Sequence, residues 1–277
     1  MIEIVKQNGE REAFDVEKLK FSLNRAGATE NVIDEITSKI EKTLKNGTTT
    51  NKIYRQAFKL LNKKEKKPAI KYSIRRSLLE LGPTGFPFEY FLAELFKEKG
   101  YKAKTSQVFS GKCVDHEIDV IAYNNDELIL VEAKFHNQHG VKSDTKTALY
   151  LKARFDDLRS ETFSIDGKNM RMTKAIIITN TKFTQNARKY AKCIGEFDLM
   201  SWNYPRDNNL YDLIEETGLQ PTTCIPILSK YEKKKLIERG IVNCRSLKNN
   251  AQAMREIGIS PKKIKEVIDN IEMICSH

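Results

Sequence analysis

The sequence predicts a multidomain protein with three parts: a small hairpin-plus-helices domain over residues 1–83, a central α/β domain with a mixed sheet over residues 84–204, and an all-α domain over residues 205–277. Three observations lead to this prediction. The turn-rich segment Gly82–Pro87 interrupts the helical periodicity of the first part. Apolar strands then alternate with amphipathic helices, which is typical of an α/β sheet, and the remaining chain is lysine-rich with helical spacing.

The first part opens with two short alternating runs on either side of Asn8-Gly9, a pair that favours the positive φ angles of a type I′ hairpin turn. Apolar residues at helical spacing follow, and Gly27 and Gly47 end two of these stripes. We therefore expect a β-hairpin and then helices within residues 19–26, 32–44, 53–61 and 69–81.

The central part predicts one helix, then three strands, and then helices and strands in alternation. The expected helices cover residues 88–96, 145–159 and 184–193, and the expected strands cover residues 105–109, 116–123, 127–135, 175–179 and 197–202. The polar segment Tyr123–Asp126 favours an antiparallel hairpin between the second and third strands. We expect helices on both faces of the sheet.

Two neighbouring strands of this part carry the most informative residues. In an extended strand successive side chains alternate between faces, so Glu132 and Lys134 project together while Val131, Ala133 and Phe135 face the other way. The same alternation on the preceding strand predicts that Glu117, Asp119 and Ile121 share one face. The hairpin would then bring Asp119 close to Glu132, so that two carboxylates and an ammonium share one site.

The composition allows a large folded core and indicates a polyanionic partner. The net charge is +11 and the isoelectric point is near 9.2, which favours nucleic acid, although a solvated basic surface gives the same values. The five cysteines are widely spaced and predict reduced packing thiols. No run approaches the length of a membrane span, and the first residues lack the pattern of a signal peptide, so we expect a cytoplasmic protein without membrane contact.

The central part resembles the PD-(D/E)xK nuclease superfamily, and the Mrr-type restriction endonucleases in particular. The resemblance rests on Glu89 in the first helix, Asp119 in HEIDVIA and the pair Glu132 and Lys134, while Ile118 stands where the motif has proline. It implies a deoxyribonuclease that uses Mg²⁺ or Mn²⁺, because a phosphodiester repels nucleophiles until a divalent cation neutralises its charge. The implied metal ligands are oxygens of Asp119, Glu132, Glu89 and the Ala133 carbonyl, and Lys134 would orient the attacking water.

The first part resembles the ATP-cone, a regulatory nucleotide-binding domain. The matching segments are Val5-Lys6 before the turn, Glu12–Asp15 leading to Lys18, the Thr49-Thr50 helix start with Tyr54, and Tyr72–Arg76. The resemblance implies binding of ATP or dATP, with Thr50 and Asn51 capping a helix next to phosphate. The implied nucleotide-binding residues are Lys6, Glu12, Lys18, Thr50, Tyr54, Arg75 and Arg76. Gln7 stands where the family has a second basic residue, and a helical packing or DNA-binding module without ligand is the alternative.

The last part contains the turns Arg239-Gly240-Ile241 and Ile257-Gly258-Ile259, each between two helical stripes. They resemble paired helix-hairpin-helix units, in which the glycines would present backbone amides to a DNA phosphate. The implied DNA-binding residues are Gly240, Gly258, Lys262 and Lys263. A plain helical cap with a solvated lysine face is the alternative.

Four further positions lie near the expected site. His136 and His139 follow the strand of Glu132 in a loop, where they would contact substrate or a second ion, or remain solvated. Lys152 and Arg154 are two residues apart on one helix and cannot share a face, so we expect at most one of them to point at phosphate.

The leading hypothesis is a Mg²⁺-dependent DNA endonuclease whose activity responds to ATP or dATP and which forms a nucleotide-dependent homo-oligomer. Two alternatives are a non-catalytic, nucleotide-responsive DNA-binding regulator and a structure-specific nuclease of repair or recombination. The absence of a GxxxxGK[ST] loop from the sequence predicts that nucleotide is bound but not hydrolysed.

Overall fold

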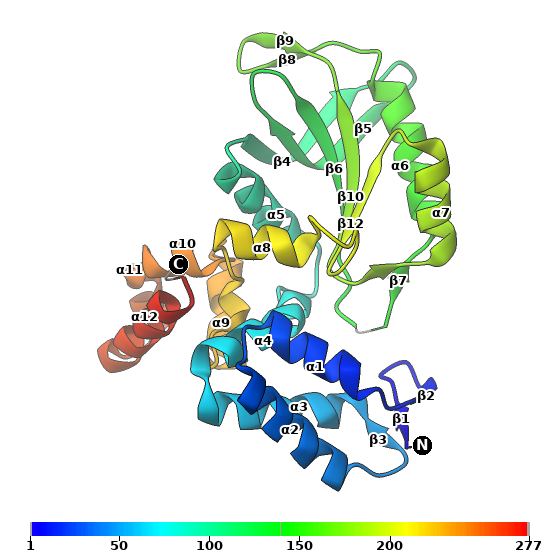
Figure 1. Ribbon diagram of the computed structural model, residues 1–277. Coiled ribbons are helices and arrows are strands. Elements are labelled where there is room, and N and C mark those ends of the chain that lie inside the picture. The colour runs from blue at the N-terminus through cyan, green and yellow to red at the C-terminus, as the bar shows by residue number, and fades with distance from the viewer. Residues whose placement is uncertain (1, 139, 276–277) are drawn as a thin grey trace.

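The computed structural model describes residues 2–138 and 140–275. The first part of the chain combines a small sheet with four helices (Figure 1). The strands are β1 (Glu3–Val5), β2 (Arg11–Ala13) and β3 (Thr48–Thr49), in the order β2-β1-β3. The helices are α1 (Val16–Arg25), α2 (Glu30–Thr43), α3 (Thr50–Lys64) and α4 (Lys66–Leu79). The predicted hairpin is confirmed, and β3 adds to it in parallel to β1.

The hairpin turn differs from the predicted type I′ geometry. That turn needs positive φ at both central residues, but only Gly9 is left-handed, with a φ of 84°, and Asn8 is not. The Lys6 amide donates to the Glu10 carbonyl at 2.8 Å and the Gly9 amide donates to the Lys6 carbonyl at 3.0 Å. The type I′ prediction was therefore wrong, because the loop is longer than two residues and one glycine supplies its left-handed position.

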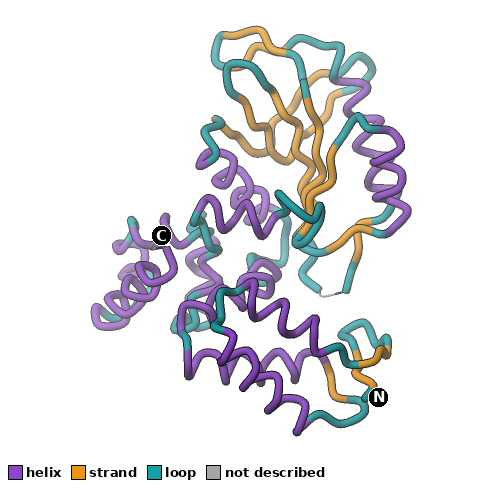
Figure 2. The backbone as a smooth tube through the Cα atoms, in the orientation of Figure 1, coloured by secondary structure: helices purple, strands orange, loops and turns teal. Residues whose placement is uncertain are grey.

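The central part is a five-stranded mixed sheet, and Figure 2 shows its strands gathered at one end of the molecule. Its strands are β4 (Lys102–Ser110), β5 (Asp115–Tyr123), β6 (Leu128–Lys134), β10 (Lys174–Thr179) and β12 (Asp198–Ser201). The order is β12-β10-β6-β5-β4, with antiparallel pairing from β4 to β6 and parallel pairing from β6 to β12. The predicted hairpin between β5 and β6 and the mixed sheet are confirmed.

Helices cover both faces of this sheet. The helix α5 (Phe86–Glu98) packs on one face, and α6 (Thr145–Leu158) and α7 (Gln185–Ile194) pack on the other. Side chains alternate accordingly: Val131 and Ala133 of β6 lie in the core under α5, and Leu130 lies in the core under α6. Two short ribbons were not predicted, namely β7 (Lys142–Ser143) with β11 (Lys182–Phe183), and β8 (Phe163–Ile165) with β9 (Lys168–Met170).

The last part is helical, as predicted. It comprises α8 (Leu210–Thr217), the 3-10 helix η1 (Thr222–Cys224), α9 (Lys230–Glu238), α10 (Cys244–Lys248), α11 (Ala251–Glu256) and α12 (Pro261–Cys275). Among the described residues no helix has the length and apolar character needed to cross a membrane.

The helix α4 belongs to two hydrophobic cores. Ala69 packs in the core of the first part, whereas Ile70, Ile74 and Leu78 pack in a larger core. That larger core continues through α5, one face of the sheet, and α8 to α12. The Thr223 hydroxyl also donates to the Ser77 carbonyl of α4 at 2.7 Å, in a buried position. The helix α4 therefore joins the core of the first part to the larger core that the central and last parts share.

Candidate active site and nucleotide-binding residues

The strands β5 and β6 separate at one end, and the carboxylate of Asp119 occupies the gap. Regular pairing runs from Tyr123 opposite Leu128 to Val120 opposite Val131. At the next position the backbone amide of Ala133 donates to Oδ2 of Asp119 at 2.7 Å. The Asp119 side chain therefore lies between the two strands and beside the next residues of β6.

The backbone near Asp119 is irregular, so one sequence expectation fails. The pairing between β4 and β5 is interrupted at Asp119. The residue of β4 at this position is Ser106, which has a left-handed φ of 51°. Ile118 packs in the same core as Ile121, which strict alternation forbids. The expectation that Glu117 shares a face with Ile121 was wrong, because the alternation is interrupted between them.

Glu132 and Lys134 project together toward α6, as predicted. Nζ of Lys134 lies 2.6 Å from Oε1 of Glu132, and Nη1 of Arg154 on α6 lies 2.5 Å from Oε2. Only 2% of the Glu132 side chain is exposed, against 37% for Lys134. Both oxygens of this buried carboxylate are thus held by cations, and Lys134 extends from the buried pair to the surface.

Arg154 is the residue that the sequence analysis left unassigned. It also donates from Nη2 to the Tyr150 hydroxyl at 2.9 Å, and its guanidinium lies 4.6 Å from the centre of the Tyr150 ring. Lys152 points away and pairs with Asp156 and Glu196. The expectation that Lys152 and Arg154 do not share a face is confirmed, and Arg154 is the one that reaches the site.

Glu89 enters the site from α5, on the opposite face of the sheet from Glu132. Loss of hydration, then the charges of Asp119, Glu117 and Glu132, raise the pKa of Glu89 to about 7. Loss of hydration and the charge of Glu132 likewise raise the pKa of Asp119 to about 6, against the lowering effect of the Ala133 amide. Carboxylates from both faces therefore meet at the open end of β5 and β6 in a region of excess negative charge.

The donor atoms suit a hard divalent cation, although they are not gathered around one point. Among residues 2–138 and 140–275 no group of three carboxylate, histidine or thiol side chains is placed to hold a metal ion. The oxygens of Glu132 are bound to Lys134 and Arg154. Asp119 and Glu89 carry oxygen atoms of the type that Mg²⁺ prefers, and burial first, then neighbouring carboxylate charge, raises the pKa of both groups.

His136 follows β6 and has a structural contact on each side. Its amide donates to Oδ1 of Asn180 at 2.9 Å, Nδ2 of Asn180 donates to its carbonyl at 2.8 Å, and Nε2 lies 3.1 Å from the Ser143 hydroxyl. Burial and then the charge of Lys134 lower the pKa of His136. His136 therefore fastens the end of β6 to neighbouring segments, and His139 lies outside the described residues.

Three of the predicted nucleotide-binding residues lie together on the hairpin and α1. Nζ of Lys6 lies 2.9 Å from Oε2 of Glu12, and Nζ of Lys18 lies 3.8 Å from the same oxygen. The register between β1 and β3 pairs Val5 with Thr49, which brings the start of α3, including Thr50, next to Lys6. A helix N-terminus beside a lysine is a favourable place for phosphate.

Two further predicted residues, Tyr54 and Arg76, belong to an aromatic and basic cluster on α3 and α4. The rings of Tyr54 and Tyr72 stack at 5.1 Å, and the Arg76 guanidinium lies 3.7 Å from the centre of the Tyr54 ring. Arg76 also donates to Oδ1 of Asn51 at 2.7 Å. The charge of Arg75 acts on Lys182 of the central part.

The cap of α3 differs from the expectation. Thr49 is the N-cap residue, and its hydroxyl accepts the Lys52 amide at 3.2 Å. The prediction that Thr50 and Asn51 supply the cap was wrong, since the helix begins at Thr50 and Asn51 binds Arg76 instead.

The glycines of the last part act as helix ends. Gly240 and Gly258 are left-handed, with φ angles of 75° and 84°, and the amides of the following Ile241 and Ile259 bond back into the preceding helices. This arrangement is a common C-terminal cap. Nζ of Lys263 lies 2.7 Å from Glu232 of α9, whereas Lys262 is exposed at the start of α12.

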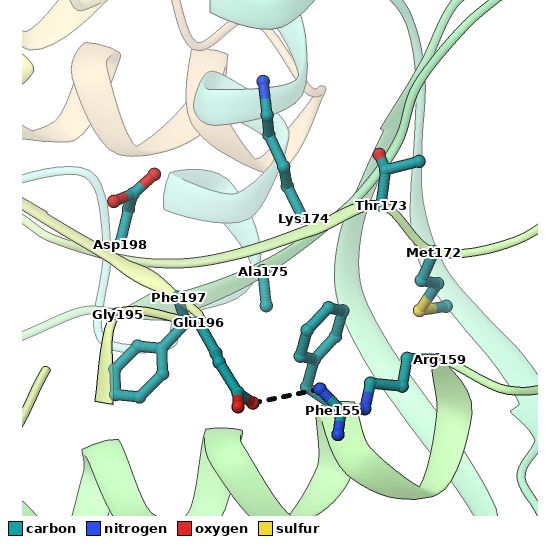
Figure 3. Close-up of a pocket in the computed structure, with 10 residues that line it drawn as sticks. All are labelled: Phe155, Arg159, Met172, Thr173, Lys174, Ala175, Gly195, Glu196, Phe197 and Asp198. Carbon is teal, nitrogen blue, oxygen red and sulfur yellow. Dashed lines mark hydrogen bonds and ion pairs between the residues drawn. The ribbon is translucent and has the colours of Figure 1, made fainter.

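A hollow of about 530 Å³ lies at the other end of the central sheet (Figure 3). It is lined by the start of β10, by Phe155 and Arg159, and by the residues around Phe197, and an ion pair of 3.0 Å joins Arg159 to Glu196. The register pairs Lys174 of β10 with Ile129 and Thr179 with Lys134, so this hollow and the acidic site lie at opposite ends of the parallel strands. None of the predicted site residues lines it.

Comparison with known families confirms the resemblances of the first and central parts and sets the class of the protein. Family models match an ATP cone domain over residues 2–79, a restriction endonuclease domain over residues 82–203 and an AF1548-like C-terminal domain over residues 221–275. The fold and the acidic site therefore define a restriction endonuclease domain that follows an ATP cone domain.

Two similar proteins place the chain in a family. An uncharacterized protein of Archaeoglobus fulgidus is 39% identical over 178 residues, which are 64% of this chain and 95% of that protein. The crystal structure of AF1548, a protein of unknown function, has a TM-score of 0.55 and 35% identity over 69% of this chain and 98% of the other. The chain belongs to the AF1548-like family of proteins with a restriction endonuclease domain.

Proposed function

We propose that this protein is a Mg²⁺-dependent DNA endonuclease whose activity is controlled by ATP or dATP bound to the N-terminal domain. The observation that carries the proposal is the Asp119 carboxylate inserted between β5 and β6, beside Glu132 and Lys134. A buried carboxylate and a strand opening are costly for a purely structural sheet. Such a carboxylate and such an opening between strands are expected where the residues bind a metal ion or take part in a reaction.

The acidic residues would hold the metal. Asp119 and Glu132 would be the main ligands, Glu89 would bind directly or through water, and the Ala133 carbonyl is a further donor, because its amide already points toward β5. When bound, Mg²⁺ or Mn²⁺ would neutralise phosphodiester charge and make a bound water more acidic. Glu132 would have to exchange part of its contact with Lys134 and Arg154 for this role.

The basic residues would act on the substrate. Lys134 is partly exposed and ends at the acidic site, so its ammonium would orient the attacking water and stabilise negative charge on the phosphoryl oxygens. Arg154 of α6 binds Oε2 of Glu132 and acts as a positioning residue. Lys262, exposed at the start of α12, is the proposed contact of the last part with the DNA backbone. Lys263 is paired with Glu232, and the amides of Gly240 and Gly258 donate to carbonyls of their own helix ends, so these groups do not serve the predicted DNA contact.

The non-catalytic alternative is favoured by one specific observation. The ion pairs of Glu132 with Lys134 and Arg154 satisfy that carboxylate without any metal. A DNA-binding regulator would keep these pairs and respond to nucleotide without cutting. A structure-specific nuclease of repair would cut, but only branched or single-stranded substrates.

A cleavage assay tests the proposal. Supercoiled plasmid, linear, branched and single-stranded DNA are incubated with the full chain, with and without Mg²⁺, and with ATP, dATP or no nucleotide. We expect Mg²⁺-dependent cleavage that changes with nucleotide. Asp119→Ala and Lys134→Ala should each lower the cleavage rate by a factor of about 100 or more, because each removes a group from the reacting centre.

Asp126→Ala is the matched control, since Asp126 is an exposed carboxylate at the far end of the same hairpin. It should cleave like the wild type. Equal cleavage by Asp119→Ala, Lys134→Ala and the wild type would remove the catalytic assignment. DNA binding without cleavage under every condition would favour the regulator.

A further inference from the structure

A short ribbon of the endonuclease domain reaches the N-terminal domain. The strands β7 and β11 pair in parallel, with Lys182 opposite Lys142, and Figure 1 shows the segment before β7 extending toward α1 and the β1–β2 hairpin. A Cβ placed on Gly140 of that segment would lie 3.3 Å from Cβ of Asn8 in the hairpin turn. The residue two positions before the ribbon is thus close to the hairpin that carries Lys6.

Cations from both domains meet at this contact. The side chain of Lys182 remains exposed, yet loss of hydration, then the charges of Arg75, Lys142, Lys6 and Arg188, lower its pKa. Lys6 and Arg75 belong to the N-terminal domain, and the other three belong to the endonuclease domain. Two lysines opposite each other in one ribbon already repel, so the arrangement is unfavourable without an anion.

The nearby carboxylates offset only part of the charge of this group, since Glu10 acts on Lys142 while it is also bound to Lys6. Among the described residues Arg75, Lys142, Lys182 and Arg188 form no ion pair with a carboxylate, and Nε of Arg188 is buried without a hydrogen-bond partner. Glu10 and Glu12, on the nearby hairpin, are already bound to Lys6. The guanidinium of Arg188 lies 4.9 Å from the centre of the Tyr204 ring, and its Nη2 donates to the Phe183 carbonyl at 3.4 Å. Its buried Nε and the excess of cations over carboxylates indicate an external anion with more than one charge.

The position of the group indicates which anion this is. Lys6 lies beside the start of α3, where the proposed nucleotide site of the N-terminal domain would hold phosphate. The cations of the ribbon approach that site from the endonuclease side. A chain of phosphates that starts at Lys6 would therefore reach Lys182 and Lys142 without leaving the contact between the domains.

We propose that the phosphate chain of the bound nucleotide bridges the two domains, with Lys142, Lys182 and Arg188 of the endonuclease domain completing the phosphate site formed by Lys6 and Arg75. This inference rests on nucleotide binding by the N-terminal domain, but not on DNA cleavage. The ribbon would then distinguish nucleotides by the number of their phosphates.

The ribbon is connected to the catalytic strand by a short polar network. His136, two residues after Lys134, binds Asn180 in the segment before β11 and the Ser143 hydroxyl of β7. A phosphate that moves the ribbon toward the N-terminal domain would also move Ser143 and Asn180, which hold His136 at the end of β6. The position of Lys134 would therefore depend on the nucleotide.

Calorimetric titration of the full chain with Mg²⁺-free ATP, AMP and adenosine tests the inference. Lys182→Gln and Lys142→Gln should each bind ATP about tenfold more weakly than the wild type, as expected for loss of a charge-assisted contact. AMP and adenosine affinities should stay the same, because their single phosphate or none does not reach the ribbon. Lys142 is exposed, so its variant remains folded.

Lys146→Gln is the matched control, since it removes an exposed charge from the same domain close to the ribbon. Its affinity for ATP should equal that of the wild type. The affinity of all variants for a DNA duplex is measured without nucleotide, because DNA phosphates are the other source of the same chemistry. The loss of DNA affinity should be no larger for Lys182→Gln than for Lys146→Gln.

Three results would overturn the inference. Unchanged ATP affinity of both ribbon variants would overturn the bridge alone. A loss confined to DNA affinity would assign the cluster to the DNA backbone. Absence of ATP binding by the wild type would overturn both the bridge and the proposed nucleotide binding. The failure of the bridge can therefore be told apart from the failure of nucleotide binding.

Discussion

The residues of the acidic site are held by contacts that cross from helix to strand. Glu132 is almost completely buried, and its charge is offset by Lys134 from its own strand and by Arg154 from α6. Removing one partner of a buried pair leaves an uncompensated charge, which costs more than the pair itself contributes. Arg154 therefore stabilises the fold and sets the position of Glu132 at the same time.

Replacing Arg154 with glutamine should lower the free energy of unfolding by about 2–4 kcal/mol, because Glu132 keeps only Lys134 as a partner. The double variant Glu132→Gln, Arg154→Gln should recover part of this loss, since no buried charge remains unpaired. Urea denaturation of the single and double variants measures both effects.

Lys152→Gln is the control on the same helix, because Lys152 pairs only with carboxylates that are partly exposed, and its effect should stay below about 1 kcal/mol. Additive effects of the two substitutions at Glu132 and Arg154 would contradict the coupling.

At this scale the sequence could predict part of the site. Strand alternation was sufficient to place Glu132 with Lys134, since both lie on one regular strand. Strand alternation did not place Glu117 correctly, because the left-handed Ser106 on β4 interrupts the pairing with β5. The sequence of β5 itself carries no signal of this interruption. Arg154 was not assignable, because its partner is fixed by the packing of α6 on the sheet.

At the scale of elements, the loop from β4 to β5 is organised by a carboxylate of α6. Oδ1 of Asp157 accepts the Cys113 amide at 2.9 Å, Oδ2 accepts the Val114 amide at 3.2 Å, and Nε2 of His116 lies 2.8 Å from Oδ2. A Cβ on Gly111 would lie 2.2 Å from the same carboxylate, so glycine is needed there for space. Asp157 thus joins the strand that carries Asp119 to the helix that carries Arg154.

These contacts give a pH-dependent prediction. The His116 contact, and then the bonds from Cys113 and Val114, lower the pKa of Asp157 from 3.8 to about 2. The stability that Asp157 contributes is therefore present above pH 4 or so and is lost as the pH falls through about 2. Asp157→Asn should lower the melting temperature by a few degrees at pH 7 and by less at pH 3.

Thermal unfolding at the two pH values tests this, with the exposed neighbour Asp156→Asn as the reference variant. A difference that stays constant or grows toward low pH would show that the charge of Asp157 is not the cause.

The sequence predicted the main elements of the central domain better than its accessory ones. Long apolar runs such as β6 and β10 carry a clear signal because they are buried on both faces. The ribbon of β7 and β11 has two residues in each strand, which is too short for any periodicity. The β8–β9 hairpin did have a signal, the pair Asp166-Gly167 with positive φ at both residues, and it was overlooked.

At the scale of the molecule, the three parts of the chain are not independent. The larger core runs from α4 through the sheet to α12. Polar contacts add to it: Nη2 of Arg25 in α1 lies 2.9 Å from Oδ1 of Asp212 in α8, and Lys71 of α4 pairs with Glu215. The sequence suggested boundaries near residues 83 and 204, from the turn-rich segment Gly82–Pro87 and from the lysine-rich helical pattern after residue 204. Neither signal reveals packing across a boundary.

We expect one cooperative unfolding transition for the whole chain rather than three. Ile74→Ala, in the shared part of α4, should lower the free energy of unfolding by about 2–5 kcal/mol and should shift that single transition as a unit. Differential scanning calorimetry gives the measurement, through the ratio of the calorimetric to the van't Hoff enthalpy.

Ile53→Ala, in the separate core of the N-terminal domain, is the comparison variant. It should shift the same transition. Two resolved transitions, of which Ile53→Ala moves only one, would contradict the shared interior.

The dual packing of α4 also limits how such proteins can be recombined. A gene fragment that begins after residue 83 would encode an endonuclease whose interior lacks Ile70, Ile74 and Leu78. Grafting a different regulatory module onto this endonuclease would succeed only if α4 stayed with the recipient, so the transferable unit begins near residue 66 and not at the visible linker.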